Sequence, residues 1–341
     1  MLGATGYTGA LVCDQLRELG FALRLLGRRR DALEAAARPG DEIGVADATD
    51  WDSVADAVDG AFAVVSTAGP FLRNGFAAVD AAVARGSHYL DSCTEQAYSR
   101  QVYERFGSRA AESGIVLLTA FANAPGDFAA GLAVEGLNAL LDEVLVANDQ
   151  SGLALSRGSR ETLAEVLEQP IVAWEDGRLV PSRFGETTRR VRFPSGERTA
   201  VEWAGAEPLT VPRHANVRRV RAYVRAPRAA ASAGKVSPRL APVVRLSAKV
   251  GRVGPSAEKR RRARFTIVAE ARSTRGEGRR VTLLGRDVYG SAALVIARGV
   301  EALRDGEARG VGALAPAEAF AASGFVAKLA PLVQVESVVD F

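Results

Sequence analysis

The sequence contains few of the residues that build metal centres or disulfide frameworks. Of 341 residues, two are cysteines, Cys13 and Cys93, and two are histidines, His88 and His214. That supply is too small for a disulfide scaffold or a four-ligand zinc site, so we expect no metal. The longest strongly apolar stretch, residues 114–122, is far shorter than the roughly 20 residues that span a bilayer. The start of the chain has no basic-then-apolar signal pattern. We therefore expect a cytoplasmic protein without stable membrane insertion.

Lysine is also scarce, with four in the chain, and charge is unevenly distributed. Residues 1–150 carry 11 Arg against 21 Asp and Glu, a net charge of −10, whereas residues 151–341 carry 33 Lys and Arg against 19 acids, a net charge of +14. A basic half can bind nucleic acid, but the chain has no repeated alternation of aromatic and basic residues that would stack bases. We expect no nucleic-acid partner, and we interpret the basic run 259–264 as a solvated face.

A glycine-rich turn stands at the start of the chain. Glycines recur every third residue and lead into a stretch with helical apolar periodicity, Ala10 to Leu19. Glycine lets the backbone approach a pyrophosphate, and the N-terminus of a helix supplies N–H groups for the anion. The turn predicts a dinucleotide site with these cofactor-binding residues: Gly3, Thr5, Gly6, Tyr7, Thr8 and Gly9.

Alternating apolar segments continue after this turn. Strands are expected at 21–26, 43–46 and 61–66, with helices at 31–37 and 51–58, which is the βαβαβ series of a parallel doubly wound sheet. Only Met1 and Leu2 precede the turn, although the first strand of such a sheet is usually central and about five residues long. We expect either further residues upstream or a sheet truncated at its centre, with poor stability.

The end of the second strand determines which nicotinamide cofactor is expected. An Asp or Glu there would bind the adenosine ribose, but this sequence has Arg28 and Arg29. Arginine favours a 2′-phosphate, so the sequence predicts NADPH rather than NADH. Asp47, which follows the next strand, is a further cofactor-binding candidate. The alternative is that Arg29 and Arg30 are solvent-exposed residues of the turn.

Motifs further along the chain resemble a known family. The segments Thr67 to Gly75 (TAGPFLRNG), Gly86 to Asp91 (GSHYLD) and Ala120 to Phe128 (AFANAPGDF), together with the glycine-rich turn, are similar to the saccharopine dehydrogenase-like oxidoreductases, which include trans-acting enoyl reductases. Weaker similarity covers 205–214, 254–256 and 285–290. The resemblance implies an NAD(P)-binding domain, a mixed α/β substrate domain, and reduction of an imine or an enoyl group.

The expected fold class is α/β, with a Rossmann-type doubly wound parallel sheet and a second mixed α/β domain containing a largely antiparallel sheet. We expect the NAD(P)-binding domain at 1–123, a substrate and dimerisation domain at 124–290, and C-terminal helices at 291–341 that return to the first domain. Turn signals at Asp176-Gly177, Pro194-Ser195-Gly196 and 276–278 predict hairpins in the second domain. Such sheets form a dimer face or a pocket wall, so a homodimer is one expectation.

The loop after the third predicted strand is expected to contact the cofactor. Its small residues let the backbone lie against a ligand at the carboxyl edge of the sheet, where open α/β sheets bind. The candidates are Thr67, Ala68, Gly69, Pro70 and Phe71, and the resemblance implies the same for the last three.

Three residues are candidates for the proton donor, and each has a structural alternative. Asp127 would act with a raised pKa but equally fits an N-cap of the helix 128–137. His88 would act just before an apolar strand but is more readily interpreted as a packed residue. Tyr289 is a conceivable acid. Asp91, Cys93 and Glu95 follow one strand into the same crevice, so one of them is expected to face substrate.

Substrate-binding candidates are Asn123, Arg157 and Arg160. Asn123 lies at the expected crossover between the domains, where a cleft would form. The resemblance implies that the start of the helix 156–167 faces substrate, where Arg157 or Arg160 would clamp a carboxylate or a carrier phosphate.

Competing enzyme classes fit the sequence less well. No tyrosine is followed by lysine four residues later, as short-chain dehydrogenases require. A Cys-dependent acyl-phosphate or semialdehyde reductase would need Cys93 as a thiolate, yet its acidic neighbours would raise the thiol pKa. A non-catalytic NADP(H)-binding sensor or partner-binding protein remains an alternative. The sequence favours an NADPH-dependent reductase that transfers hydride to the C=C or C=N bond of an acidic or carrier-linked small molecule.

Overall fold

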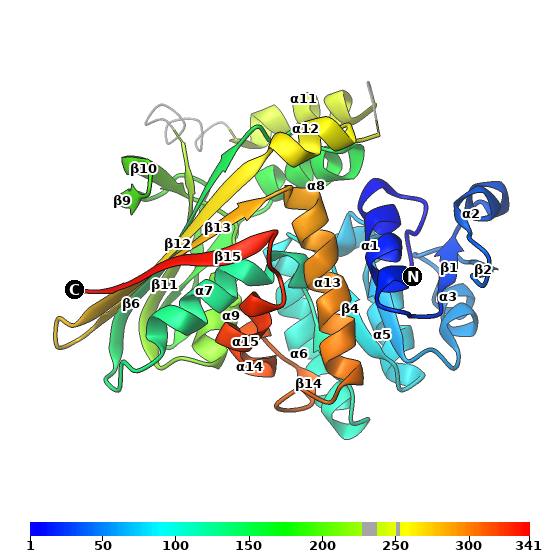
Figure 1. Ribbon diagram of the computed structural model, residues 1–341, viewed down its shortest axis with the longest axis horizontal. Helices are drawn as coiled ribbons and strands as arrows, with labels where there is room; N and C mark the ends of the chain where they lie inside the picture. The colour runs from blue at the N-terminus through cyan, green and yellow to red at the C-terminus, as the bar shows by residue number, and fades with distance from the viewer. Residues whose placement is uncertain (227–236, 250–252) are drawn as a thin grey trace. The chain divides into compact units, whose positions relative to one another are not determined.

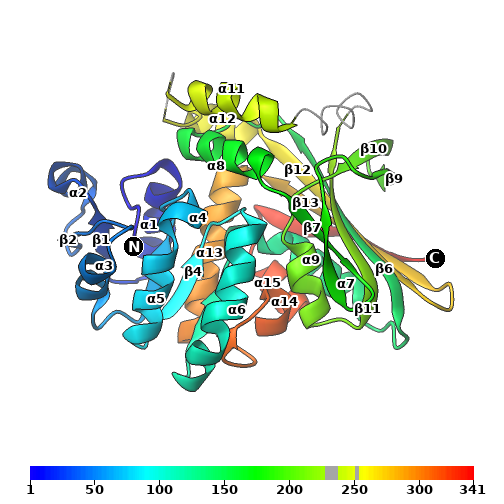
Figure 2. The ribbon, with the colours of Figure 1, turned by 180° about the vertical axis from the view of Figure 1, so that it is seen from behind.

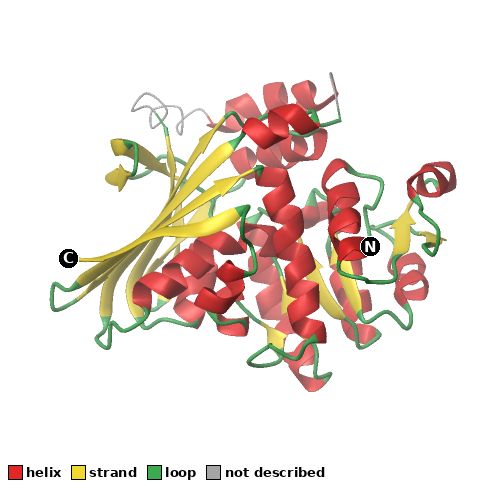
Figure 3. Cartoon of the chain, viewed as in Figure 1, coloured by secondary structure: helices red, strands yellow, loops and turns green. Residues whose placement is uncertain are grey.

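Short apolar strands alternate with helices through Leu118, and every pairing among these strands is parallel (Figures 1 and 3). The computed structural model describes residues 1–226, 237–249 and 253–341. One side of the sheet has the order β14-β5-β4-β3, and the other side is β1-β2. The strands are β1 (Arg24–Gly27), β2 (Glu42–Val45), β3 (Ala63–Ser66), β4 (His88–Asp91), β5 (Val116–Leu118) and, late in the chain, β14 (Gly312–Ala313).

The first residues of the chain fill the position between β3 and β1. The Leu2 N–H donates to the Val65 carbonyl at 2.8 Å, and the Leu26 N–H donates to the Met1 carbonyl at 2.9 Å. Leu2 forms parallel bridges to both neighbouring strands and is almost completely buried. The position predicted for a first strand is therefore occupied by a short bridging segment.

Helices cover both faces of this sheet. Figures 1 and 2 show α1 (Tyr7–Glu18) and α13 (Val288–Arg304) on one face, with α5 (Phe76–Ala84) and α6 (Gln96–Glu112) on the other. The expected Rossmann-type doubly wound sheet is thus confirmed. The shorter helices of this part are α2 (Arg30–Ala36), α3 (Trp51–Val58), α4 (Phe71–Asn74) and the 3₁₀ turn η1 (Phe121–Asn123).

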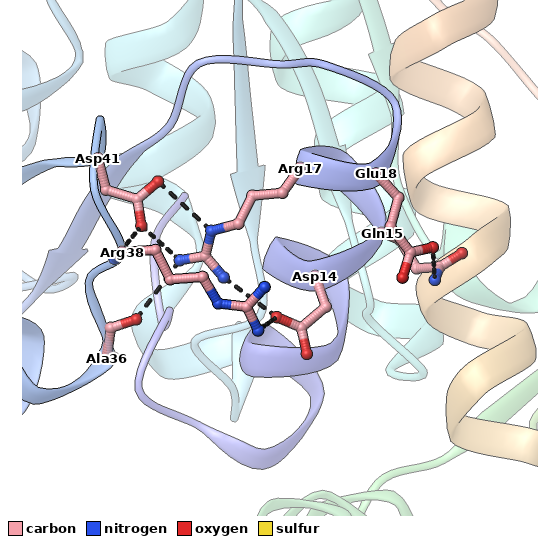
Figure 4. A network of polar contacts seen from close by, with 7 residues as sticks. All are labelled: Asp14, Gln15, Arg17, Glu18, Ala36, Arg38 and Asp41. Carbon is pink, nitrogen blue, oxygen red and sulfur yellow. Dashed lines mark hydrogen bonds and ion pairs between the residues drawn. The ribbon is translucent and has the colours of Figure 1, made fainter.

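A polar network fixes the second half of α1 against the loop between α2 and β2 (Figure 4). The Arg17 guanidinium donates to Asp41 and to the Ala36 carbonyl, and it also pairs with Asp14 at 3.1 Å. Arg38 donates to the same Asp14 at 2.6 Å, and its backbone N–H donates to Asp41. Two arginines that share two carboxylates restrain the helix far more than one exposed pair would. This network holds α1 in place behind the glycine-rich turn.

The second half of the chain is built on a nine-stranded sheet, counted over the described residues. Its order is β15-β13-β12-β6-β11-β10-β9, with the hairpin β7-β8 attached to β11; only β6 and β11 pair in parallel there. This confirms the largely antiparallel sheet. The strands are β6 (Leu141–Ser151), β7 (Ile171–Glu175), β8 (Arg178–Ser182), β9 (Thr188–Phe193), β10 (Gly196–Glu202), β11 (Val217–Arg225), β12 (Arg264–Ser273), β13 (Gly278–Arg286) and β15 (Val333–Asp340).

The predicted hairpins are present, and the helices of this part are mostly short. Asp176 and Gly177 both have positive φ angles, 44° and 86°, as a two-residue hairpin turn requires. The helices are α7 (Ala124–Val134), α8 (Arg157–Glu168), α9 (Glu207–Thr210), the 3₁₀ turn η2 (Val211–Arg213), α11 (Ser237–Lys249), α12 (Ala257–Arg262), α14 (Pro316–Ala319) and α15 (Ala322–Ala327).

The chain divides into two units. The first consists of Met1–Ala122 and Tyr289–Leu314, and the second of Asn123–Val288 and Ala315–Phe341. One expectation needs correction, because the C-terminal segment returns to the first unit only as far as Leu314. After that point β15 pairs with β13 and completes the larger sheet. The backbone groups of this last strand form hydrogen bonds with β13 rather than within a helix, which fits its alternating apolar residues.

Candidate functional site

The glycine-rich turn has the close geometry that only glycine allows. Gly3 has φ +81°, and a Cβ there would lie 2.8 Å from the Thr67 hydroxyl oxygen. A Cβ on Gly9 would collide with the Gly3 carbonyl, so α1 could not begin where it does. Gly6 is the N-cap of α1 and brings no side chain to the first turn of the helix. Gly3, Gly6 and Gly9 thus bring no side chain to this end of α1, where a phosphate group can approach N–H donors.

Thr67 joins this turn to the end of β3. Its N–H donates to the Leu2 carbonyl at 3.0 Å, and its hydroxyl lies 3.3 Å from the carbonyl oxygens of Leu2 and Gly3. The loop that follows, Ala68 to Phe71, therefore leaves the sheet beside the glycine-rich turn. The structure brings the two groups of predicted cofactor-binding residues to the same edge of one sheet.

A buried carboxylate holds the start of α4. Glu95 Oε2 accepts the Phe71 N–H at 2.8 Å, and Oε1 accepts the Leu72 N–H at 3.4 Å. Asn74 donates from Nδ2 to the Gly69 carbonyl at 3.3 Å, which fixes the other end of the same loop. Glu95 is 4% exposed. The sequence expectation that Glu95 could face substrate is not supported, because both of its oxygens bind the backbone.

Asp91, at the end of β4, performs a similar task one loop further along. Its Oδ1 accepts the Cys93 N–H at 2.9 Å and the Ala120 N–H at 2.7 Å. Burial raises the pKa of Asp91 to about 7, although these two N–H groups act to lower it. Asp91 and Glu95 together connect the loops after β3, β4 and β5. Each of these buried carboxylates holds loops in place by accepting their backbone N–H groups. The pattern of apolar residues in a sequence cannot identify such a role.

Cys93 is unsuited to be a nucleophile. The side chain is completely buried, and burial, together with the carboxylates of Asp91 and Glu95, raises the thiol pKa well above its ordinary value. The predicted direction of this shift is confirmed. A thiol that stays protonated near neutral pH cannot open the acyl-transfer route of a semialdehyde reductase.

Two of the three arginines after β1 have unpaired guanidinium groups. Arg28 and Arg29 are exposed and form no ion pair or side-chain hydrogen bond within the described part of the chain, whereas Arg30 pairs with Glu34 at 3.7 Å. The pKa of Asp47 is held low by the backbone and hydroxyl groups of Thr49 and, to a smaller extent, by Arg28. Arg28 thus lies near Asp47, at the carboxyl edge of the sheet.

Tyr289 and His88 differ in their relation to this edge. The Tyr289 ring meets the Tyr7 ring edge-on, with 5.1 Å between centroids, so it packs directly on the glycine-rich turn. His88 begins β4, at the opposite edge of the sheet from that turn. Its Nδ1 accepts the Val116 N–H at 3.0 Å, and burial lowers its pKa. The suggestion that His88 donates a proton is corrected, because the residue packs against the sheet away from the predicted site.

Asp127 is also corrected, both as an N-cap and as an acid. Asn123 is the N-cap of α7, and Asp127 lies one turn inside the helix. Its Oδ1 lies 2.9 Å from His214 Nε2, and its Oδ2 accepts the Ala317 N–H at 2.8 Å. Burial would raise the pKa of Asp127, but these partners and Thr210 hold it below its ordinary value. An aspartate that stays ionised cannot supply a proton near neutral pH.

Glu207 lies in the same buried cluster of the second unit. Burial raises its pKa to about 7, and the Asp127 carboxylate adds to the effect. Gly126 and Gly205 make room for it, since a Cβ on either would collide with the carboxylate oxygens. Glu207 Oε2 has no hydrogen-bond donor among the described residues. No local sequence pattern indicates this cluster, because His214 and Glu207 stand more than 70 positions from Asp127.

The predicted substrate residues lie at helix starts of the second unit. Asn123 is exposed at the start of α7, and Arg157 is exposed at the start of α8. Arg160 donates to the Leu155 carbonyl at 2.9 Å. An open depression of about 670 Å³ in the second unit is lined by other residues, among them Trp174, His214 and Arg218. Within the described residues, no group of three or more His, Cys, Asp or Glu is placed to hold a metal ion.

Sequence relatives support the assignment of the first unit. A family model described as NAD(P)H-binding matches residues 3–107. A trans-acting enoyl reductase of Mycobacterium ulcerans is 28% identical over 212 residues, which cover 57% of this chain and 50% of that protein. A lipid droplet localized protein of Caenorhabditis elegans is 26% identical over 181 residues, 47% of this chain and 42% of that protein. The chain spans about half the length of the curated relatives it matches.

Among solved structures, apo saccharopine dehydrogenase (L-Glu forming) from Saccharomyces cerevisiae aligns with a TM-score of 0.62 at 12% identity and covers 98% of both chains. At this level of identity the likeness concerns the fold. The chain therefore contains an NAD(P)H-binding domain within the fold of saccharopine dehydrogenase, which confirms its resemblance to the saccharopine dehydrogenase-like oxidoreductases.

Proposed function

We propose that this protein is an NADPH-dependent reductase that transfers hydride to the C=C bond of a carrier-linked enoyl substrate. The observation that carries the proposal is the convergence of the glycine-rich turn, the Thr67 loop and the unpaired Arg28 and Arg29 at one edge of the parallel sheet. Open α/β sheets bind dinucleotides at this edge.

Residues of the first unit fit such a cofactor. The N–H groups around Gly6 and the start of α1 would hold the pyrophosphate, because glycine at positions 3, 6 and 9 brings no side chain there. Arg28 and Arg29 would bind the 2′-phosphate, since neither guanidinium is paired with a carboxylate of the described residues. Asp47 would complete the adenosine side, and Gly69 to Phe71 the nicotinamide side.

The substrate proposal rests on the relatives and on charge. The curated relatives named above include trans-acting enoyl reductases, and the second half of the chain is strongly basic. A basic half suits an acidic or phosphate-bearing acyl carrier. Asn123, Arg157 and Arg160 are the candidates for contacting it. An imine is the second substrate class, since reduction of a C=N bond also requires the protein to hold the acceptor and provide a proton.

Hydride transfer places modest demands on the side chains. The nicotinamide, when bound, supplies the hydride, and the protein must hold the acceptor and provide a proton. Tyr289 is the candidate for the proton, because it packs on Tyr7 of the glycine-rich turn. Asp127 and His88 are bound elsewhere, so water is the alternative source. Because Asp127 and His88 are both held by other hydrogen bonds, a non-catalytic NADP(H)-binding protein is the second candidate function.

The test begins with titrations of NADPH and NADH followed by nicotinamide fluorescence. Arg28→Ala should weaken NADPH binding about 10- to 100-fold and leave NADH binding unchanged, because a charge-assisted bond to phosphate contributes about 1.5 to 3 kcal/mol. Arg30→Ala is the matched control and should have no effect. NADPH oxidation with an enoyl thioester of pantetheine then tests catalysis. Binding without turnover of enoyl or imine substrates would favour the sensor, and no nucleotide binding would reject both.

A further inference from the structure

Helix α11 presents large apolar side chains on its outer side. The helix packs on α8, and its Ala241 and Ala248 are buried. Val243 and Leu246, one turn apart, are 66% and 63% exposed. These are the two highest values among the large apolar residues described by the structure. A surface helix of a soluble domain normally turns polar residues outward, so this ridge requires an explanation.

The ridge continues into a basic region. Val253 is 52% exposed, and its carbonyl accepts the Arg157 N–H at the start of α8. Helix α12 follows directly, and Figures 1 and 2 show it at the same end of the second unit as α11 and α8. On α12, Lys259 and Arg261 are exposed and form no ion pair with any residue described by the structure.

Charge of one sign is concentrated in this part of the sequence. Residues 237–264 contain nine Lys or Arg residues and a single acid, Glu258. Their net charge of +8 exceeds the +4 of the whole chain. Some of these charges are used within the fold, since Arg245 pairs with Glu168 and Arg260 with Asp287. Lys259 and Arg261 are exposed on α12, and Val243 and Leu246 are exposed on α11. Exposed cations together with exposed aliphatic side chains are typical of helices that bind the interface of a bilayer.

We infer that α11, Val253 and α12 form a docking surface, the α11–α12 surface, for the headgroup region of an anionic lipid bilayer. Val243 and Leu246 would enter the acyl boundary, and Lys259 and Arg261 would meet lipid phosphates. Nucleic acid would bind the cations, but it would leave the exposed apolar side chains of the ridge without a partner. Among the described residues, no helix is long and apolar enough to cross a membrane, so binding would be peripheral. The inference does not depend on the proposed reductase activity.

The experiment is sedimentation of the full chain with vesicles. Neutral phosphatidylcholine vesicles are compared with equal mixtures of phosphatidylcholine and phosphatidylglycerol, at low and high salt. We expect binding to the anionic vesicles only, and weaker binding at high salt because exposed charges are screened. Lys259→Glu with Arg261→Glu should weaken binding by at least about 25-fold, since each cation near the surface contributes roughly fivefold.

A second variant separates the apolar contribution from charge. Val243→Ser with Leu246→Ser keeps every charge and should weaken binding to anionic vesicles at least about tenfold. Val45→Ser with Val311→Ser is the matched control, because both residues are about half exposed in the first unit. All variants replace exposed side chains, so their melting temperatures should equal that of the wild type. Equal binding by all variants would overturn the inference, as would absence of vesicle binding together with tight binding of an acidic carrier protein.

Discussion

His214 Nε2 lies 2.9 Å from Asp127 Oδ1, and both side chains are almost fully buried. Because the carboxylate accepts, Nε2 is the donor. Burial lowers the pKa of His214, but the Asp127 carboxylate reverses this effect and raises it above its ordinary value. The pair is therefore a buried hydrogen bond to a carboxylate that joins α7 to the residue after η2.

Breaking this pair should destabilise the protein strongly. Asp127→Asn leaves a buried imidazole without its anionic partner, and we expect a loss of about 3 to 5 kcal/mol in urea unfolding. Arg218→Ala removes the exposed pair with Asp176, which is the matched control and should leave the stability nearly unchanged. Stability from Asp127 is lost as pH falls below its lowered pKa, and stability from His214 is lost as pH rises through its raised pKa. Equal costs for the buried and exposed pairs would contradict this account.

Glu207 should make the protein less stable at high pH. Its pKa is about 7 in the fold and about 4.5 in the unfolded chain, so the unfolded state ionises first as pH rises. Stability therefore falls between about pH 4.5 and 7. Glu207→Gln should remove that dependence, with an advantage about 3 kcal/mol larger at pH 8 than at pH 4. Urea unfolding at both pH values tests this, and an advantage that is the same at both would exclude the raised pKa.

Glu95 should matter for the cofactor although we do not expect contact with it. Glu95→Ala leaves the N–H groups of Phe71 and Leu72 without acceptors, which costs about 1 to 3 kcal/mol and releases the loop. We expect NADPH affinity to fall about tenfold. Glu104→Ala, which removes an exposed pair with Arg100 in the same helix, should change neither affinity nor stability. A lower melting temperature with unchanged affinity would show that Glu95 only stabilises the fold.

Gly9→Ala should abolish nucleotide binding. The added Cβ would collide with the Gly3 carbonyl, so α1 must shift and the phosphate turn must open. A loss of at least about 100-fold in NADPH affinity is expected, comparable to removing more than one charge-assisted hydrogen bond. Gly20→Ala is the control, because a Cβ on Gly20 would meet no atom within 4 Å, although Gly20, unlike Gly9, has a positive φ. It should cost about 1 kcal/mol of stability and leave affinity intact.

Both thiols should be unreactive in the native protein. Cys13 and Cys93 are buried, and burial raises the pKa of each. We expect labelling by a thiol-specific disulfide reagent to be slow in buffer and complete within minutes in urea. Fast native labelling of Cys93 that is slowed by NADPH would revive the Cys-dependent reductase.

The sequence predicted the first unit better than the second for a physical reason. In the parallel sheet, β1, β3, β4 and β5 are largely buried and are recognisable as short apolar runs between helices, so their positions were predictable. Strand β6 lies at the centre of the larger sheet but carries Asp142, Glu143 and Asp149. Asp142 and Asp149 pair with Arg219 and Arg225 of the neighbouring β11, and Glu143 pairs with Arg189 of β9. These acids give the strand a polar sequence, which hides its strand pattern. Pairing partners so distant in sequence leave no local signal.

The candidate site divides along the same line. Glycines and arginines of the turn could be assigned because backbone geometry and phosphate chemistry restrict which residues can stand there. Asp127 could be suspected, but its role depends on His214 and Ala317, which a local pattern cannot bring to it. The bracing by Asp91 and Glu95 was hidden for the same reason, since each bonds to backbone groups more than 20 residues away.

The hydrogen bonds accepted by Glu95 and Asp91 also connect the cofactor loop to the segment that leads into the second unit. Glu95 holds the loop at Phe71, and Asp91 holds Ala120, three residues before Asn123, where the chain enters the second unit. Asp91 and Glu95 are joined by the short, buried segment through Cys93. We therefore expect the Phe71 loop and the turn at Ala120 to be ordered together. A ligand that orders the Phe71 loop would therefore also order the segment that leads from Ala120 to Asn123, and part of the loss of conformational entropy would come from that segment. Cofactor binding would then restrict the motion of the first of the three chain crossings between the units.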